Sequence, residues 1–104
     1  MREYREGLAR IGALVSSRLE DCASGARVRI GGLSVCLQVP PTAKGFAFLT
    51  LEDEEGLMNI VLRPDIYTAF RQVVRLEPLL FVEGILEKKD GVINVMAQRV
   101  VPLS

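Results

Sequence analysis

Two phenylalanines and one asparagine are the residues of this sequence best suited to holding a flat ligand. Phe46 and Phe48 are two positions apart in an apolar segment, so in a β-strand their side chains share one face. Asn59 falls on the matching face of the next apolar segment. Aromatic rings stack on nucleobases and an amide hydrogen-bonds to base edges, so this set predicts a nucleobase-binding platform. Both strand faces are apolar, which leaves open that the rings belong to the core or lie beneath an N-terminal helix.

Lysines flank this platform in the sequence. Lys44 ends a loop shaped by proline and glycine, and Lys88 and Lys89 lie in a predicted hairpin turn. Positive charge beside stacked bases is what a phosphate backbone requires, so we include all three lysines in the predicted interface. For Lys88 and Lys89 the simpler interpretation is the stronger one, namely solvated lysines that protect a sheet edge from aggregation.

Residues typical of catalysis are missing from this sequence. It contains no histidine, which excludes acid–base chemistry through an imidazole. The carboxylate run 52–55 is consecutive on a predicted hairpin, so its side chains diverge and cannot converge on one Mg²⁺ ion. Asp53 is expected instead to accept hydrogen bonds from backbone amides of the turn. Without a nucleophile–base pair or a phosphate-binding loop, the chain alone is predicted to be no enzyme and to use no cofactor or metal.

The period of the apolar residues changes along the chain. From Tyr4 to Val15 they recur at helical spacing, which predicts one or two N-terminal helices. From residue 25 the period is two, and Gly31-Gly32 interrupts the first strand at a predicted bulge or sharp bend. The other predicted elements are strands over 46–53, 57–62, 79–86 and 92–100 and a helix that begins at Pro64.

Five strands with a helix between the third and the fourth follow the order of the OB-fold, a mostly β, five-stranded Greek-key barrel. An SH3-like barrel lacks this helix, and an open α+β sheet is the other alternative. We predict a helical lead-in over residues 1–24 and an OB-fold nucleic-acid-binding domain over 25–104. The lead-in must dock on a larger body, because an isolated helix of this length is marginal in water.

Charge and composition narrow the class of partner and the compartment. The 104 residues carry 13 basic and 13 acidic side chains, which excludes a general polyanion-binding protein. However, residues 25–51 contain three basic residues and no acidic one, which leaves room for a local contact with a single strand. The longest apolar run, 79–82, is too short to span a bilayer, and the first residues are charged, so we predict a cytoplasmic protein without a membrane partner. Cys22 and Cys36 form no metal or redox motif; a disulfide and two thiols are the alternatives.

Longer motifs show a resemblance to a known family. Residues 38–59, with Pro-x-Thr-Ala-Lys-Gly at 40–45 and Phe-Leu-Thr-Leu-Glu-Asp at 48–53, resemble the C-terminal OB domain of bacterial DNA polymerase III alpha subunits. Arg63-Pro64, Val82-Glu83-Gly84 and residues 90–95 are similar to later parts of that domain, and the similarity is greatest to the error-prone branch. The resemblance covers essentially the whole chain.

The resemblance implies a part of a polymerase whose catalytic carboxylates lie in another domain. It implies contact with single-stranded template DNA in replication or translesion synthesis through Lys44, Phe48 and Asn59, with Arg29 as a phosphate contact. The remaining partner is then the rest of the alpha subunit. Leu37 and Val39 stand where the error-prone branch often has basic residues, which implies modest DNA affinity for the isolated domain.

Two other interpretations stay open. Phe48-x-x-Leu51-x-Asp53, followed by Gly56 and Asn59, also resembles the anticodon-binding OB domain of class II aminoacyl-tRNA synthetases, which implies an RNA partner. The other is a protein-interaction module that uses the same barrel to dock a polymerase partner. The loop at residues 42–45 fits the polymerase family better than the synthetases.

Overall fold

The computed structural model describes residue 19 and residues 21–103, so the predicted N-terminal helices lie almost entirely outside the described residues. The described elements follow the predicted order, with five strands and one α-helix. They are β1 (Arg27–Gln38), the short 3₁₀ helix η2 (Pro41–Ala43), β2 (Ala47–Glu52), β3 (Leu57–Leu62), α2 (Pro64–Leu76), β4 (Leu79–Lys89) and β5 (Val92–Pro102).

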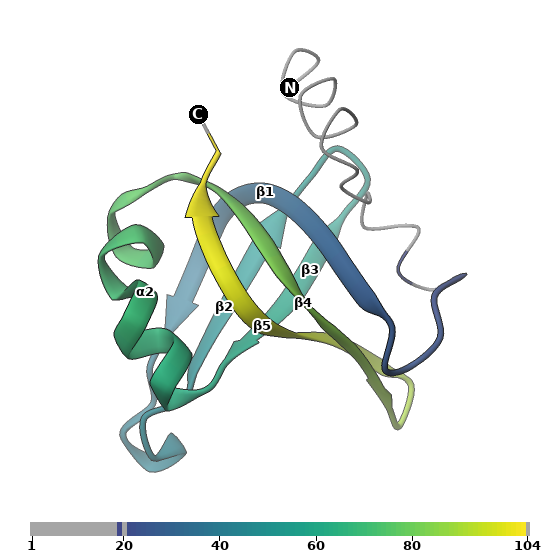
Figure 1. The fold of residues 1–104 in the computed structure, drawn as a ribbon, viewed down its shortest axis with the longest axis horizontal. Coiled ribbons are helices and arrows are strands. Elements are labelled where there is room, and N and C mark those ends of the chain that lie inside the picture. The colour runs from purple at the N-terminus through teal and green to yellow at the C-terminus, as the bar shows by residue number, and fades with distance from the viewer. Residues whose placement is uncertain (1–18, 20, 104) are drawn as a thin grey trace.

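The five strands close into a barrel in the order β1-β2-β3-β5-β4, and β4 pairs back onto β1 (Figure 1). Every neighbouring pair is antiparallel except β3 and β5, which run parallel. A closed five-stranded barrel with a helix between β3 and β4 is the OB-fold. This confirms the predicted fold class and excludes the open sheet.

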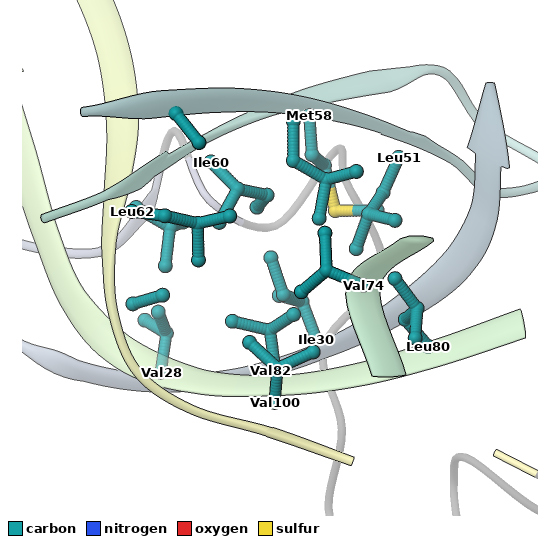
Figure 2. Packing of buried hydrophobic residues seen from close by; sticks show 14 of the residues in the cluster. Val28, Ile30, Leu51, Met58, Ile60, Leu62, Val74, Leu80, Val82 and Val100 are labelled. Carbon is teal, nitrogen blue, oxygen red and sulfur yellow. The ribbon is translucent and has the colours of Figure 1, made fainter. Parts of the chain in front are cut away.

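Period-two alternation fills the barrel with aliphatic side chains. In β2 and β3 the inward residues are at most 2% exposed, while their neighbours in the sequence face outward. Figure 2 shows side chains from different strands meeting in this interior. The inward set in β1, β2 and β3 follows this alternation: Val28, Ile30, Ala47, Leu49, Leu51, Met58, Ile60 and Leu62 are all buried.

Strand β1 pairs with both β4 and β2, and Gly31 and Gly32 lie just before the point where its partner changes. Residues 27–33 pair with β4, whereas residues 33–38 pair with β2, so Leu33 faces Leu79 on one side and Glu52 on the other. A Cβ on Gly32 would lie 2.6 Å from the backbone oxygen of Glu52. Only glycine permits this approach of two strands. The irregularity in β1 lies a little further on, where its register with β2 shifts between Ser34 and Cys36, and not at Gly31-Gly32 as predicted.

Helix α2 covers one end of the barrel, and residues 21–26 lie at the opposite end (Figure 1). Pro64 occupies the first turn, where its missing N–H costs no hydrogen bond, as predicted. Val74 is the fully buried residue of α2 and joins the core cluster. The helix thereby closes this end of the barrel, and most of its contacts with the strands are made to β5.

Three strands, β2, β4 and β5, differ from the prediction in their boundaries, and β2 ends at Glu52 rather than at residue 53. Phe46 precedes β2, because its N–H donates to the carbonyl oxygen of Ala43 and so keeps the residue in the loop. β4 and β5 extend to residues 89 and 102, beyond the predicted 86 and 100. In β4 the additional pairing, from Glu87 with Asn94 to Lys89 with Val92, continues where exposed polar residues end the apolar alternation.

Candidate nucleic-acid interface

The outer face of β2 and β3 carries the predicted platform. Phe48 is 40% exposed and Asn59 is exposed, while Ala47, Leu49 and Ile60 beside them are buried. The predicted outward direction of Phe48 and Asn59 is therefore confirmed, and Phe48 is not a core residue. An exposed aromatic side chain on a rigid strand has the form of a base-stacking surface.

The pairing register extends this face into two rows that cross four strands. Facing residues of a strand pair point to the same side of the sheet, so the register states which side chains lie next to one another. One row is mostly apolar and consists of Gln38 (β1), Phe48 (β2), Val61 (β3) and Met96 (β5). The other is polar and consists of Cys36, Thr50, Asn59 and Asn94 on the same four strands.

Phe46 does not belong to either row. It lies in the loop that precedes β2 and is half-buried. The prediction that Phe46 and Phe48 share one face of the same strand is therefore wrong, because the hydrogen bond from Phe46 N–H to Ala43 keeps Phe46 in the loop before β2. A contact between Phe46 and a base stays a prediction.

Lys44 is held by a short, well-defined loop at the start of β2. It follows the 3₁₀ helix η2 and has a left-handed backbone conformation, with φ of 53°. Gly45, with φ of +91°, lies against the ring of Pro64, where a Cβ would come within 3.2 Å. The contact between Gly45 and Pro64 joins this loop to the start of α2. Lys44 and Arg63, which precede these two residues in the sequence, are both exposed. Two basic residues therefore lie near that end of the platform, together with the exposed Asp65 in the first turn of α2.

Lys88 and Lys89 lie at the end of β4 and not in the turn. The turn itself is Asp90-Gly91, both with positive φ, so the predicted placement of the two lysines in the hairpin turn is wrong. Lys89 shares the face of Glu87, which pairs with Asn94, so it stands beside the polar row. Lys88 points to the other face, and its backbone N–H donates to the Ser24 hydroxyl at 3.1 Å. The loop between β1 and β2 and the β4–β5 hairpin lie at the two lower corners of Figure 1.

Arg29 lies on a different part of the barrel. It pairs with Glu83 of β4 in the strand register, and its Nε lies 4.0 Å from the Glu83 carboxylate. Arg99 of β5 approaches the same carboxylate at 3.4 Å. Glu83 therefore offsets part of the positive charge here, and the phosphate contact implied for Arg29 stays a prediction.

The acidic run at the β2–β3 turn has a local structural role. Asp53 is buried, and its Oδ1 accepts hydrogen bonds from the backbone N–H of Glu55 at 2.8 Å and of Gly56 at 3.0 Å. This confirms the predicted role of Asp53 in the turn. Within residues 19 and 21–103 no three His, Cys, Asp or Glu side chains gather as metal ligands would.

Comparison with known proteins assigns the chain to a family. Residues 37–103 match the tRNA anticodon family model, described as an OB-fold nucleic acid binding domain. The chain belongs to this family. The matched segment of the OB domain includes β2, β3 and β5, the three strands that carry Phe48, Asn59 and Asn94.

Several longer bacterial proteins are similar to this OB domain. An error-prone DNA polymerase of Caulobacter vibrioides is 44% identical over 97% of this chain, and one of Corynebacterium efficiens is 40% identical over 99%. One of Bdellovibrio bacteriovorus is 42% identical over 85% of the chain. The OB domain spans 9%, 10% and 8% of these three relatives, respectively, so it corresponds to a small part of each.

Solved structures share the fold at low sequence identity. An asparaginyl-tRNA synthetase from Pyrococcus horikoshii has a TM-score of 0.74 and 18% identity, and the match covers 88% of this chain and 23% of the synthetase. An OBody bound to hen egg-white lysozyme has a TM-score of 0.60 and 14% identity, covering 78% of this chain and 81% of the OBody chain. These likenesses show the barrel architecture alone.

Of the four residues in the polar row, sequence reasoning named only Asn59 as a binding residue. Cys36 was considered only as a thiol, Thr50 only for sharing a strand face with Phe48, and Asn94 only as part of the last strand. Alternation places Asn94 on the outer face of β5, because Val95 beside it is fully buried. Its position next to Asn59 depends on the parallel β3–β5 pairing that closes the barrel. No local sequence signal states that pairing.

Proposed function

We propose that this OB domain is a non-catalytic part of an error-prone type DNA polymerase and holds single-stranded template DNA. The observation that carries the proposal is the 44% identity to an error-prone DNA polymerase over 97% of this chain. In this role the domain serves DNA replication and translesion synthesis in the cytoplasm, with the rest of the polymerase chain as its second partner. No described helix has the length and apolar character that crossing a membrane requires.

The charges and side chains of the interface support a path for the strand. Phosphates would enter beside Lys44 and Arg63, bases would contact the row of Phe48, Val61 and Met96, and the path would leave beside Lys89. Cations flank the platform at two places far apart in the sequence, Lys44 in the loop before β2 and Lys89 at the end of β4. Because phosphate contacts position a strand while stacked rings hold it, few cations suffice for a modest, salt-dependent affinity.

RNA is the second candidate ligand. The family model that matches residues 37–103 bears the name of the tRNA anticodon domain, and an asparaginyl-tRNA synthetase has a similar fold. At 18% identity this likeness carries less weight than the polymerase relatives. A protein is the third candidate ligand, since an OBody with this fold is bound to lysozyme.

Fluorescence anisotropy with the 104-residue chain tests the proposal. The ligands are a labelled single-stranded oligodeoxynucleotide, the duplex of the same sequence and an unfractionated tRNA, each at low and at moderate salt. We expect the single strand to bind most tightly and its affinity to fall as salt rises. Absence of binding at high micromolar protein in low salt would overturn the proposal, and tight binding confined to tRNA would support the RNA alternative.

A further inference from the structure

The only two asparagines of the sequence are partners on the barrel surface. Asn59 of β3 and Asn94 of β5 face each other in the parallel pair, and their neighbours Ile60 and Val95 are buried. Both amides therefore lie on the outer face, about 4.8 Å apart at the backbone, the spacing of adjacent strands. The pair lies in the polar row, directly beside the row that contains Phe48.

Neither amide has a side-chain hydrogen bond to another residue within the described part of the chain. Each thus offers a carbonyl oxygen and an NH₂ group in one plane. Every nucleobase presents a hydrogen-bond donor next to an acceptor on its Watson–Crick edge, and an unpaired strand leaves that edge accessible. Two adjacent amides fit such an edge better than they fit a phosphate, which offers acceptors only.

The position of Phe48 decides where the base would lie. Phe48 faces Val61, two residues after Asn59 along β3, so Phe48 and Asn59 are diagonal neighbours across the strand pair. Diagonal positions of this kind are about 7–8 Å apart and within reach of an aromatic ring or a ligand that lies on one. A base stacked on Phe48 would therefore extend its edge toward the two amides.

We infer that Asn59 and Asn94 together read the edge of a base stacked on Phe48, so that binding depends on base hydrogen bonding and not only on stacking and phosphate contacts. This inference rests on the proposed binding of a single strand to this face. The amide pair reaches across strands that are distant in sequence, so it exists only in the folded barrel. Asn94 is a binding residue that the sequence pattern did not identify.

The test compares a short labelled oligothymidylate with the same strand in which difluorotoluene, a nonpolar shape mimic, replaces thymine. The mimic keeps the ring and the phosphates but forms no base-edge hydrogen bonds. We expect the wild-type chain to bind the mimic about fivefold more weakly or worse, since a good amide–base contact discriminates by at least that factor. Asn94→Ala and Asn59→Ala should each weaken oligothymidylate binding and reduce the difference between the two strands.

Two further variants keep the outcome interpretable. Asn94→Leu has similar volume on the same strand and should behave as Asn94→Ala does, whereas Gln98→Ala removes an exposed amide of β5 outside both rows and should retain wild-type discrimination. Equal binding of the two strands by the wild-type chain overturns the inference while leaving the proposed function intact. Equal losses on both strands in the asparagine variants overturn it also, because they indicate a purely structural role. Failure of the wild-type chain to bind either strand overturns the proposed function and the inference together.

Discussion

Gly45 packs against Pro64, and this contact joins the loop before β2 to the first turn of α2. The two residues are separated by the whole β2–β3 hairpin in the sequence. Their contact, together with the left-handed backbone at Lys44, holds that cation at one end of the outer face of β2 and β3. A lysine in such a loop has less freedom to lose on binding than one at a mobile hairpin tip, which makes it the stronger candidate for a phosphate contact.

Lys44→Ala should weaken single-strand binding by a similar factor for all sequences and lower the salt slope by about 1, the effect of losing one phosphate contact. The measurement is the slope of log affinity against log salt from anisotropy titrations. Arg29→Ala serves as the comparison, and its effect should be smaller because Glu83 lies 4.0 Å from the guanidinium group. An equal decrease in both variants would show that the strand also crosses the β1–β4 side of the barrel.

Phe48→Ala should reduce single-strand affinity without unfolding the domain. Loss of one stacked base costs roughly 1–3 kcal/mol of binding free energy, which raises the dissociation constant about 5- to 150-fold. Because Phe48 is 40% exposed, the urea midpoint should change little. Leu76→Ala is the matched control, since Leu76 is 75% exposed on α2 and away from both rows. Unchanged affinity in Phe48→Ala would contradict stacking on this ring.

The reactivity of the Cys36 thiol can show whether bound DNA covers the polar row. Cys36 is exposed in the polar row next to Thr50, whereas Cys22 is half-buried, and both are thiols. In a Cys22→Ser variant, saturating single-stranded DNA should slow maleimide alkylation of Cys36, and mass spectrometry measures the rate. The same variant carrying Phe48→Ala should lose the protection at that DNA concentration. Alkylation at the same rate with and without bound DNA would place the strand elsewhere on the barrel.

Gly32→Ala should destabilise the fold without a direct effect on binding residues. The added Cβ would meet the backbone oxygen of Glu52 at 2.6 Å, and backbone cannot yield as a flexible side chain does. We expect a loss of about 1–3 kcal/mol in the free energy of unfolding, the usual cost of overpacking. Chemical denaturation measures it, with Ser34→Ala in the same strand as a control of smaller effect. A stability equal to wild type would mean that β1 and β2 separate readily at their closest point.

Local alternation in the sequence predicted which residues share a face of each strand, and the small, aliphatic side chains of one face indicated which face fills the barrel. Leu49 and Ile60 are buried and Phe48 and Asn59 face outward as expected, because a strand turns successive side chains to opposite faces whatever its neighbours are. The close approach of two strands at Gly32 and the turn at Asp53 also follow from residue type. Each of these predictions depends on a few adjacent residues.

Tertiary structure alone decided which outward residues are neighbours. Asn94 lies beside Asn59 because β5 pairs in parallel with β3, and Arg29 lies beside Glu83 because the first half of β1 pairs with β4. Tertiary structure also set where strands end. Cross-strand pairing with β5 extends β4 through Lys89, although its apolar pattern ends earlier. The physical reason is that alternation is a property of one strand, while register is set by closing the barrel around a single core.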